Sequence, residues 1–396
     1  MLTVEDALDR ILSRVKALGS EHVDLVRSQG RVLAEPIVSR RNIPPWPNSS
    51  MDGYALRAAD ATVSGARLRV SMVIAAGVMP KTALAPGEAA RIFTGAPLPP
   101  GADSVIPQEH VAADGDLITL ASPVKPGDFV RPAGEDVRPG DELAEPGRMI
   151  GPPEIGMLAA LGYTAVRVYR RPRVAILSTG DELADLGSEP GPGQIPNTNS
   201  YTLMAQVRET GGEPMNLGVA RDRREDIEER LRWGQSADVL LTSAGVSVGD
   251  YDFVKEAFAS LGATIHLWKV SMRPGKPVTF GSLGPQAVFG LPGNPVSAMV
   301  TFELFVRPAL RKLAGHRQLT RPIIRAEALA PIPNQGAPRG YLRVTLTPVN
   351  GGYGARLTGD QGSSIIKSMM LADGLAVVPP NTIIELGAPV DVMVLR

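Results

Sequence analysis

The sequence predicts an α/β and β protein of several domains, with a mostly parallel sheet in its central domain. Its 396 residues exceed the size of one usual hydrophobic core. From Arg173 onward, short apolar runs alternate with helical patterns, which is typical of a parallel sheet covered by helices. Glycine (42 residues) and proline (36) gather toward the two ends of the chain, where they favour turn-rich β structure.

These changes of pattern suggest four parts. They are a central α/β domain (1–19 and 172–320), a connecting domain (20–39 and 141–171), an inserted β-rich lobe (40–140) and a C-terminal β domain (321–396). In the last part, alternating segments such as Tyr341–Leu346 and Val390–Leu395 indicate a β barrel or sandwich.

The central domain is organised around the stretch from Asp238 to Asp252. Val239–Leu241 is an apolar run that suits a strand buried on both faces. Hydroxyl-bearing residues and glycines follow it, and then an apolar-periodic segment begins at Phe253. A small-residue loop between a strand and a helix suits anion binding, although such a loop is often only a tight connection.

A second copy of this arrangement lies upstream. Val174–Leu177 is another apolar strand, and it continues into Ser178-Thr179-Gly180-Asp181-Glu182. Two strand ends of one sheet would then present hydroxyls, glycines and carboxylates together. That combination fits a phosphorylated ligand with a bound cation.

Helix signals accompany these strands. A helix is expected from Thr3 to Gly19, with Thr3 and Asp6 as a capping pair. Asp222 and Glu225 have the same spacing before a helix at 225–233. Asn294 and Pro295 suit the start of a long helix that ends at Ala314. Further helices are expected at 153–161, 201–209 and 253–261.

Composition excludes several classes of protein. Lys+Arg (41) balances Asp+Glu (41), so no global field favours nucleic acid or an anionic membrane. The absence of cysteine excludes disulfides, thiolate metal sites and Cys nucleophiles. The N-terminus has no signal-peptide pattern, and no run approaches the roughly 20 apolar residues of a membrane span. We expect a cytoplasmic protein.

Four more loops combine charge with rigid turns. Residues 48–55 place Asp52 between hydroxyls and a glycine, and Thr94 follows a strand in the loop 91–103. The segments 131–136 and 269–277 carry charged side chains, and the second is followed by 291–298. A Ser/Asp turn is the plainer interpretation of 48–55, and a solvated basic loop is the plainer interpretation of 269–277 with 291–298.

These stretches together resemble the molybdopterin molybdenumtransferase family, the MoeA-type enzymes of molybdenum cofactor biosynthesis, which are related to the E domain of gephyrin. The matching motifs occur in the family's order and span residues 49 to 298. They are SSMDGYA, FTGAPLPPGAD, GEDVRPGD, STGDEL, TSAGVSVGDYDFVK, MRPGKPVTFG and LPGNPVSA. The resemblance implies a homodimer with a central molybdopterin-binding domain. It also implies Mg²⁺-dependent insertion of molybdate into adenylylated molybdopterin, with release of AMP.

The resemblance also implies which residues form the site, because each matching motif position can be assigned a role. The catalytic positions are Asp52, Thr94, Arg131, Asp136, Glu182, Asp222, Asp252, Lys269, Arg273 and Lys276. The substrate-binding positions are Ser178, Thr179, Gly180, Ser243, Gly245, Ser247, Gly249 and Asn294. The molybdate candidates are Arg273, Lys276, Pro277, Ser297, Arg343 and Ser368.

The residue types agree with this chemistry. Mg²⁺ is usually held by one or two carboxylates and waters, and Glu182, Asp222, Asp250 and Asp252 are the expected ligands. Molybdate is a tetrahedral dianion and needs cations with hydroxyl or amide donors. The four histidines have no metal-ligand spacing.

Two positions depart from the family pattern. Arg273 stands where lysine is more common, which keeps the charge and changes the geometry. Ala244 stands where a second glycine is expected, and it is expected to restrict the loop.

Two other functions remain open at this point. One is the adenylyltransferase that activates molybdopterin, which as a separate protein lacks the β lobes and the SMDGY motif. The other is a scaffold without catalysis, as in receptor anchoring by gephyrin. Expected partners are a second copy of the chain, the molybdopterin adenylyltransferase and molybdoenzyme maturation proteins.

Overall fold

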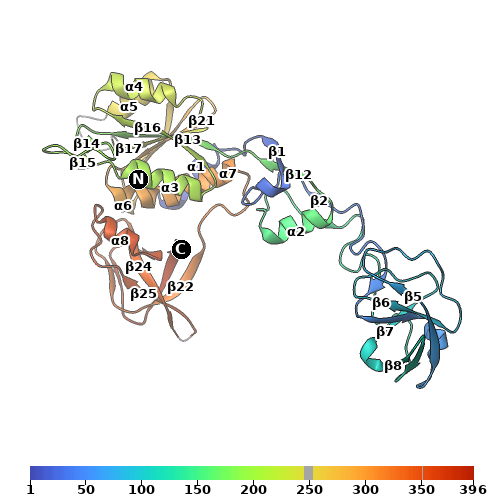
Figure 1. Cartoon of the computed structure of the whole chain (residues 1–396). Helices are drawn as coiled ribbons and strands as arrows, with labels where there is room; N and C mark the ends of the chain where they lie inside the picture. The colour runs from blue at the N-terminus through green and yellow to red at the C-terminus, as the bar shows by residue number, and fades with distance from the viewer. Residues whose placement is uncertain (245–252, 350) are drawn as a thin grey trace. The chain divides into compact units, whose positions relative to one another are not determined.

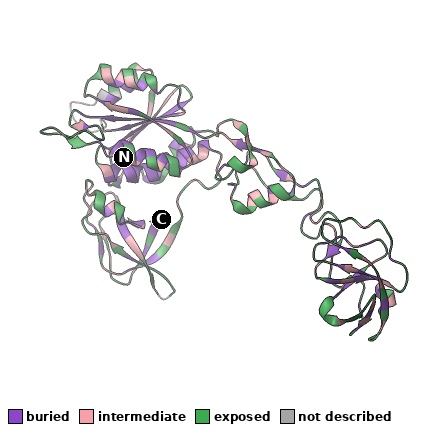
Figure 2. Ribbon diagram, in the orientation of Figure 1, coloured by how far each residue is buried: buried purple, intermediate pink, exposed green. Residues whose placement is uncertain are grey.

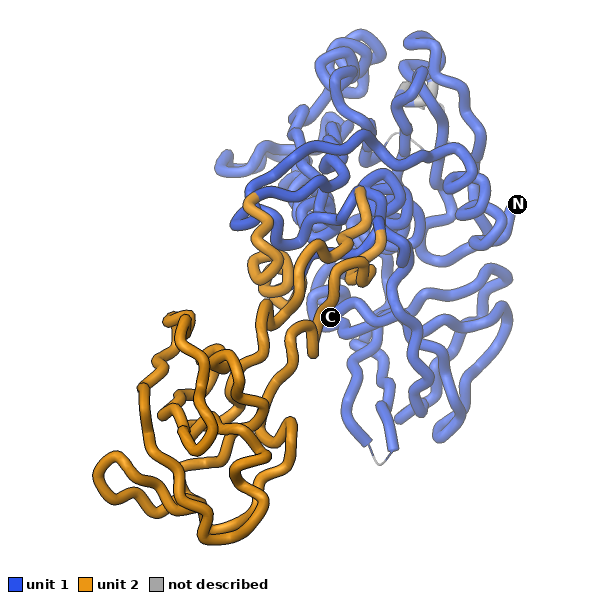
Figure 3. Tube along the Cα trace, turned by 90° about the vertical axis from the view of Figure 1, so that its right-hand side faces the viewer, with its two compact units in different colours: residues 1–34, 146–151, 165–396 blue, residues 35–145, 152–164 orange. Residues whose placement is uncertain are grey.

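The structure is a computed structural model that describes residues 1–244, 253–349 and 351–396. The chain forms two compact units (Figure 3). The first contains residues 1–34, 146–151 and 165–396, and the second contains residues 35–145 and 152–164. The four-part division expected from the sequence is finer than these two units and stays a prediction.

A six-stranded sheet forms the centre of the first unit (Figure 1). In spatial order its strands are β16 (Glu213–Ala220), β13 (Arg173–Thr179), β17 (Val239–Ser243), β21 (Gln286–Leu291), β20 (Thr279–Leu283) and β18 (Thr264–Trp268). The first four are parallel to one another, and β20 is antiparallel to both of its neighbours. The predicted α/β domain with a mostly parallel sheet is therefore confirmed.

The register of this sheet places the carboxyl ends of β13, β17 and β21 next to one another. Ser178 pairs with Ser243, and Ser243 pairs with Leu291. All five residues of β17 are buried, as expected for an apolar central strand. The carboxyl ends of β13, β17 and β21 therefore lie side by side at one edge of the sheet.

Helices cover both faces of the sheet. One face packs against α1 (Val4–Leu12), α3 (Asn199–Glu209), α6 (Pro295–Thr301), the π-helical segment η4 (Phe302–Val306) and α7 (Arg307–Leu313). The other face packs against α4 (Arg224–Trp233) and α5 (Phe253–Ser260). Figure 2 shows the buried residues of the sheet between these two helical layers. None of the described helices is long and apolar enough to cross a membrane.

The caps of α1, α4 and α6 match the predictions to different degrees. The capping box of Thr3 and Asp6 is confirmed, but α1 ends at Leu12 and does not reach Gly19. The capping pair Asp222–Glu225 was wrong, because Arg223 occupies the cap and makes no side-chain cap hydrogen bond. Asn294 does occupy the cap of α6, but its amide donates to Ser363 Oγ instead.

The C-terminal region is a closed barrel of five strands. Its members are β24 (Arg339–Val349), β25 (Gly352–Leu357), β22 (Ile323–Ala328), β28 (Pro389–Val394) and β26 (Gly374–Val378), and β26 pairs back onto β24. The short helix α8 is Ile366–Met370, and a small sheet joins β23 (Ile332–Asn334) to β27 (Thr382–Ile384). The strand β19 (Met272–Arg273) pairs with β24 and so ties the central domain to the barrel.

The second unit is built on a six-stranded sheet. In spatial order it contains β7 (Ser104–Pro107), β4 (Gly53–Leu56), β6 (Glu88–Ile92), β5 (Arg67–Ile74), β9 (Leu117–Leu120) and β8 (Val111–Asp114). Shorter elements of this unit are β2 (Ile37–Val38), β3 (Asn48–Ser49), β10 (Val130–Arg131), β11 (Glu142–Ala144), α2 (Pro152–Ala160), η2 (Ala58–Asp60) and η3 (Gln108–His110). The remaining short elements of the first unit are β1 (Ser20–Asp24), β12 (Ala165–Tyr169), β14 (Leu183–Ala184), β15 (Ile195–Pro196) and η1 (Leu25–Arg27).

Candidate functional site

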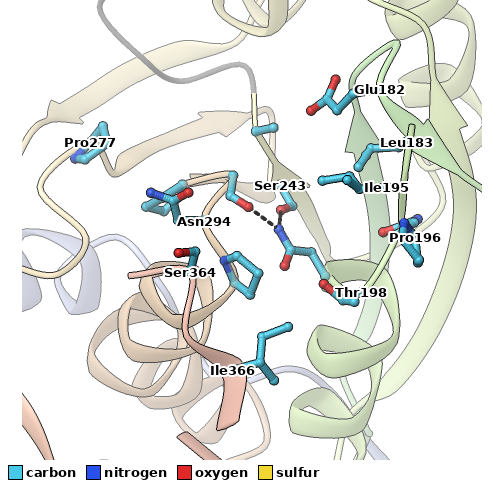
Figure 4. A pocket seen from close by; sticks show the side chains of 16 residues that line it. Glu182, Leu183, Ile195, Pro196, Thr198, Ser243, Pro277, Asn294, Ser364 and Ile366 are labelled. Carbon is cyan, nitrogen blue, oxygen red and sulfur yellow. Dashed lines mark hydrogen bonds between the residues drawn. The ribbon is translucent and has the colours of Figure 1, made fainter. Parts of the chain in front are cut away.

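A cavity of about 610 Å³ opens at the carboxyl ends of β13, β17 and β21. Figure 4 shows Ser243 between Glu182 on one side and Asn294 on the other. The remaining lining residues are Leu183, Ile195, Pro196, Asn197, Thr198, Asn199, Ala244, Pro277, Pro292, Gly293, Pro295, Ser364 and Ile366. The wall therefore combines amide and hydroxyl side chains with leucine, isoleucine and proline.

Buried hydrogen bonds fix two of the strand ends. Ser178 Oγ lies 2.8 Å from Ser200 Oγ and 3.2 Å from Asn197 Oδ1, and Asn197 Nδ2 donates to Ser200 Oγ at 2.9 Å. Asn199 Nδ2 donates to Ser243 Oγ and to the carbonyl oxygen of Gly293, each at 2.7 Å. The ends of β13 and β17 are thus held by polar side chains from the start of α3.

Gly180 is required where β13 gives way to the acidic loop. A Cβ at this position would lie 2.4 Å from a carboxylate oxygen of Glu182, and the backbone has a φ of +147°. The Oγ1 atom of its neighbour Thr179 is buried and has no hydrogen-bond partner among the described residues. The loop therefore brings the Glu182 carboxylate against the strand end.

A cluster of carboxylates lies beside this loop. Burial, followed by the negative charges of Glu182 and Asp181, raises the pKa of Asp222 above its usual value. The described residues contain no group of three or more His, Cys, Asp or Glu arranged to hold a metal. Two of the expected metal ligands, Asp250 and Asp252, lie outside the described residues, as do Gly245, Ser247 and Gly249.

The predicted cations lie on the loop that precedes β20. Arg273 and Lys276 are exposed, Lys269 is half-buried, and Pro277 lines the cavity. A Cβ on Gly275 would lie 2.4 Å from Thr301 Cγ2, so only glycine lets this loop pack against α6. Ser297, which is 4% exposed, lies in the first turn of α6.

The barrel adds a buried arginine. Arg343 has no exposed surface, and it donates to Ser368 Oγ at 3.0 Å and to the carbonyl oxygen of Gly362 at 3.0 Å. Burial lowers the pKa of Arg343 to about 10; Asp360 opposes this shift and Arg273 adds to it. Its Nη1 atom is buried without a hydrogen-bond partner among the described residues.

The barrel also meets the start of α6. The carbonyl oxygen of Ser363 accepts from the backbone N–H of Val296, and its hydroxyl accepts from Asn294 Nδ2 at 2.9 Å. Ser364 and Ile366 continue this segment into the cavity wall. The cavity is therefore built from the sheet, α6 and the barrel.

The second unit holds the remaining four predicted residues. Asp52 Oδ1 accepts from both the backbone N–H and the hydroxyl of Thr94, and these bonds lower the pKa of Asp52. Arg131 is exposed and pairs with Asn48 in the β3–β10 ladder, and Asp136 is exposed. The structure thus brings Asp52 and Thr94 together.

Sequence reasoning missed several residues of the cavity wall. They are Asn197, Thr198, Asn199, Ser364 and Ile366. The run Asn197-Thr198-Asn199-Ser200 was the available signal, because four successive polar residues at the start of a helix exceed what capping needs.

The sheet and its helices belong to a class of domain that is described as probably molybdopterin-binding. Residues 175–312 match the model of a probable molybdopterin-binding domain. Residues 2–162 match the MoeA N-terminal region (domains I and II), and residues 325–395 match the MoeA C-terminal region (domain IV).

Full-length relatives then identify the family. The molybdopterin molybdenumtransferase of Nostoc sp. is 39% identical over 100% of this chain and 94% of its own. The enzyme of the same name from Haemophilus influenzae is 39% identical over 81% of this chain and 80% of its own. A crystal structure titled as a molybdopterin biosynthesis MoeA protein from Pyrococcus horikoshii superposes with a TM-score of 0.86 at 32% identity, covering 100% of this chain and 99% of that one. The chain belongs to the molybdopterin molybdenumtransferase family, a family of transferases.

Proposed function

We propose that this protein inserts molybdate into adenylylated molybdopterin, with Mg²⁺-dependent release of AMP, in molybdenum cofactor biosynthesis. The observation that carries this proposal is the cavity of about 610 Å³ at the ends of three parallel strands, whose wall includes Ser243, Asn294 and Glu182. The relatives that match this chain over its whole length bear the name of this transferase. We also keep the cytoplasmic location as a prediction.

The strand ends are our candidates for binding the nucleotide and pterin parts of the substrate. Ser243 and Asn294 line the cavity, and Ser178 and Thr179 are buried beside it at the end of β13. Hydroxyl groups and backbone N–H groups are suitable donors for phosphate oxygens. Gly245, Ser247 and Gly249 belong to the same proposed set.

The acidic cluster is our candidate for holding Mg²⁺. Burial, and after it the negative charges of Glu182 and Asp181, raise the pKa of Asp222. A bound cation would offset that negative charge, and carboxylate oxygens are the ligands that Mg²⁺ prefers. Glu182 and Asp222 would hold the ion, and Asp250 and Asp252 are the further proposed ligands. When bound, the ion would neutralise negative charge on the phosphoanhydride.

The cationic loop and the buried arginine are our candidates for binding molybdate. Arg273 and Arg343 lie close enough for Arg273 to lower the pKa of Arg343, which fits two cations that share an anion. The unpaired Nη1 of Arg343 supports this assignment, since a buried donor normally finds a partner. Lys269, Lys276, Pro277, Ser297 and Ser368 complete the proposed set.

The second unit would complete the site from a second copy of the chain. Asp52, Thr94, Arg131 and Asp136 are its proposed contributors, and the protein would act as a homodimer. Contacts with the molybdopterin adenylyltransferase and with molybdoenzyme maturation proteins belong to the same proposal.

The test is AMP release from adenylylated molybdopterin. We expect release only when Mg²⁺ and molybdate are both present. Equal release without molybdate would indicate a simple hydrolase and contradict the proposal. No release under any condition would favour a scaffold.

A further inference from the structure

We propose that Asn199 is a positioning residue that aims the hydroxyl of Ser243 at a phosphate oxygen of the substrate. This inference rests on the proposed function, because it assumes that the cavity receives a phosphorylated ligand. It concerns an amide that the family motifs quoted above do not include.

The geometry leaves Asn199 little freedom. It is the first residue of α3 and is 8% exposed. Its Nδ2 atom donates to Ser243 Oγ and to the carbonyl oxygen of Gly293, each at 2.7 Å. Because the Gly293 oxygen can only accept, the amide nitrogen must face these two partners. Both N–H groups of the side chain are therefore used by the protein.

This arrangement fixes the role of the Ser243 hydroxyl. Its oxygen accepts the bond from Asn199, and its own proton has no acceptor among the described residues. A hydroxyl that already accepts one hydrogen bond becomes a stronger donor. Ser243 is 1% exposed and lines the cavity, so its proton is available to a ligand there. A phosphate oxygen, which only accepts, is the matching partner.

Asn199 also ties together two loops that touch. A Cβ on Gly293 would lie 3.2 Å from the Cβ of Ala244, the residue that follows Ser243. The bond from Asn199 to Gly293 therefore holds the loop before α6 against the end of β17. Loss of the amide would free the Ser243 hydroxyl to rotate and would loosen this contact.

A double-mutant cycle with ADP as the probe separates positioning from simple stability. Binding is measured by calorimetry for the wild type, Asn199→Ala, Ser243→Ala and the double variant. We expect each single change to weaken ADP binding about tenfold, and the double variant to bind no more weakly than Ser243→Ala. Asn216→Ala removes an exposed amide on β16 and should leave ADP affinity unchanged.

If Asn199→Ala does not fold, Asn199→Asp provides a second test, because the aspartate side chain has nearly the same size and shape as asparagine. Its carboxylate would accept the Ser243 proton and remove the donor, so ADP should bind more weakly than to the wild type. Because the bond to the Gly293 oxygen is lost as well, the thermal midpoint should fall, and ADP binding is measured below it. Additive losses in the cycle, or wild-type affinity in the aspartate variant, would overturn the role of Asn199 and leave the proposed function intact. If the wild type itself does not bind ADP, both the phosphate site and this inference fail.

Discussion

Thr94 donates its backbone N–H and its hydroxyl to the same oxygen of Asp52, each at 2.7 Å. The two bonds hold one carboxylate oxygen in place and lower the pKa of Asp52, the backbone bond being the larger cause. The paired residues come from two motifs, SMDGY and FTGAP, that lie far apart in the sequence.

Removing the hydroxyl should therefore raise the pKa of Asp52. Thr94→Val keeps the backbone N–H, so we expect only part of the shift to be lost, and Thr94→Ser should retain it. An NMR titration of the Asp52 carboxyl carbon measures this directly. Since the folded pKa lies below the unfolded value, the ionised Asp52 favours folding at neutral pH, and this contribution is lost as pH falls through the folded pKa. An unchanged titration in Thr94→Val would show that the hydroxyl bond is unimportant.

The pKa of Asp222 is shifted in the opposite direction from that of Asp52, so its effect on stability has the opposite dependence on pH. Its pKa is raised, so its protonated form is favoured in the folded state, and stability falls as pH rises from the usual value through the folded pKa. Glu182→Gln removes one negative neighbour and should lower the pKa of Asp222, although burial remains. Added Mg²⁺ should lower the pKa of Asp222 in the wild type. If the pKa did not change when Mg²⁺ was added, the ion would bind elsewhere.

The rate of AMP release provides a second test of the carboxylate cluster around Asp222. Asp222→Asn keeps the shape and removes a charge, so AMP release should fall by orders of magnitude while the fold persists. Asp185→Asn, an exposed change in the neighbouring loop, serves as the matched control and should retain activity. Wild-type AMP release in Asp222→Asn at low Mg²⁺ would remove this residue from the proposed metal set.

The sheet and most of its helices follow from the sequence because burial repeats with a regular period. The end of α1 does not: Val15 and Leu18 continue the apolar stripe, yet they pack against the core outside the helix. The backbone N–H of Leu18 bonds to the carbonyl oxygen of Leu313, a partner that periodicity cannot reveal. Tertiary hydrogen bonding therefore overrides the local pattern there.

In the candidate site, too, features set by neighbouring residues could be predicted from the sequence, and contacts between distant residues could not. The strand-end hydroxyls and the acidic loop could be predicted from a short apolar run followed by small polar residues. The contacts of Asn199 could not, because its partners Ser243 and Gly293 lie 44 and 94 positions away along the chain. The burial of Arg343 likewise depends on the barrel closing around it.

Ala244 offers a test of backbone strain beside the cavity. Its φ of 77° lies in the left-handed region, which costs about 1–2 kcal/mol for a residue with a Cβ. Ala244→Gly should therefore raise the thermal midpoint or leave it unchanged despite the added freedom of the unfolded chain. Ala220→Gly, at a buried position without positive φ, should lower it. If both variants lost stability equally, Ala244 would not be strained.

Lys276→Ala tests the proposed molybdate pocket. Loss of this cation should weaken molybdate binding and suppress metal insertion while largely preserving ADP binding, which is assigned to the strand ends. Lys81→Ala removes an exposed lysine from the second unit and serves as the control. Unchanged molybdate dependence in Lys276→Ala would move the oxyanion site away from this loop.

Complementation tests whether two chains share each site. Asp52→Ala and Lys276→Ala are each expected to be inactive, but a mixed dimer would contain one intact site. With random exchange of subunits, the mixture should regain about a quarter of wild-type activity. Exchange is verified by native mass spectrometry. Full exchange without recovered activity would mean that both residues act within one chain.

The amount of molybdenum in the product tests the central claim most directly. The wild type is incubated with adenylylated molybdopterin, Mg²⁺ and molybdate, and the pterin-bound metal is measured together with the released AMP. We expect equal amounts of pterin-bound molybdenum and AMP, and neither from Asp222→Asn. AMP release that leaves the pterin free of molybdenum would contradict the account.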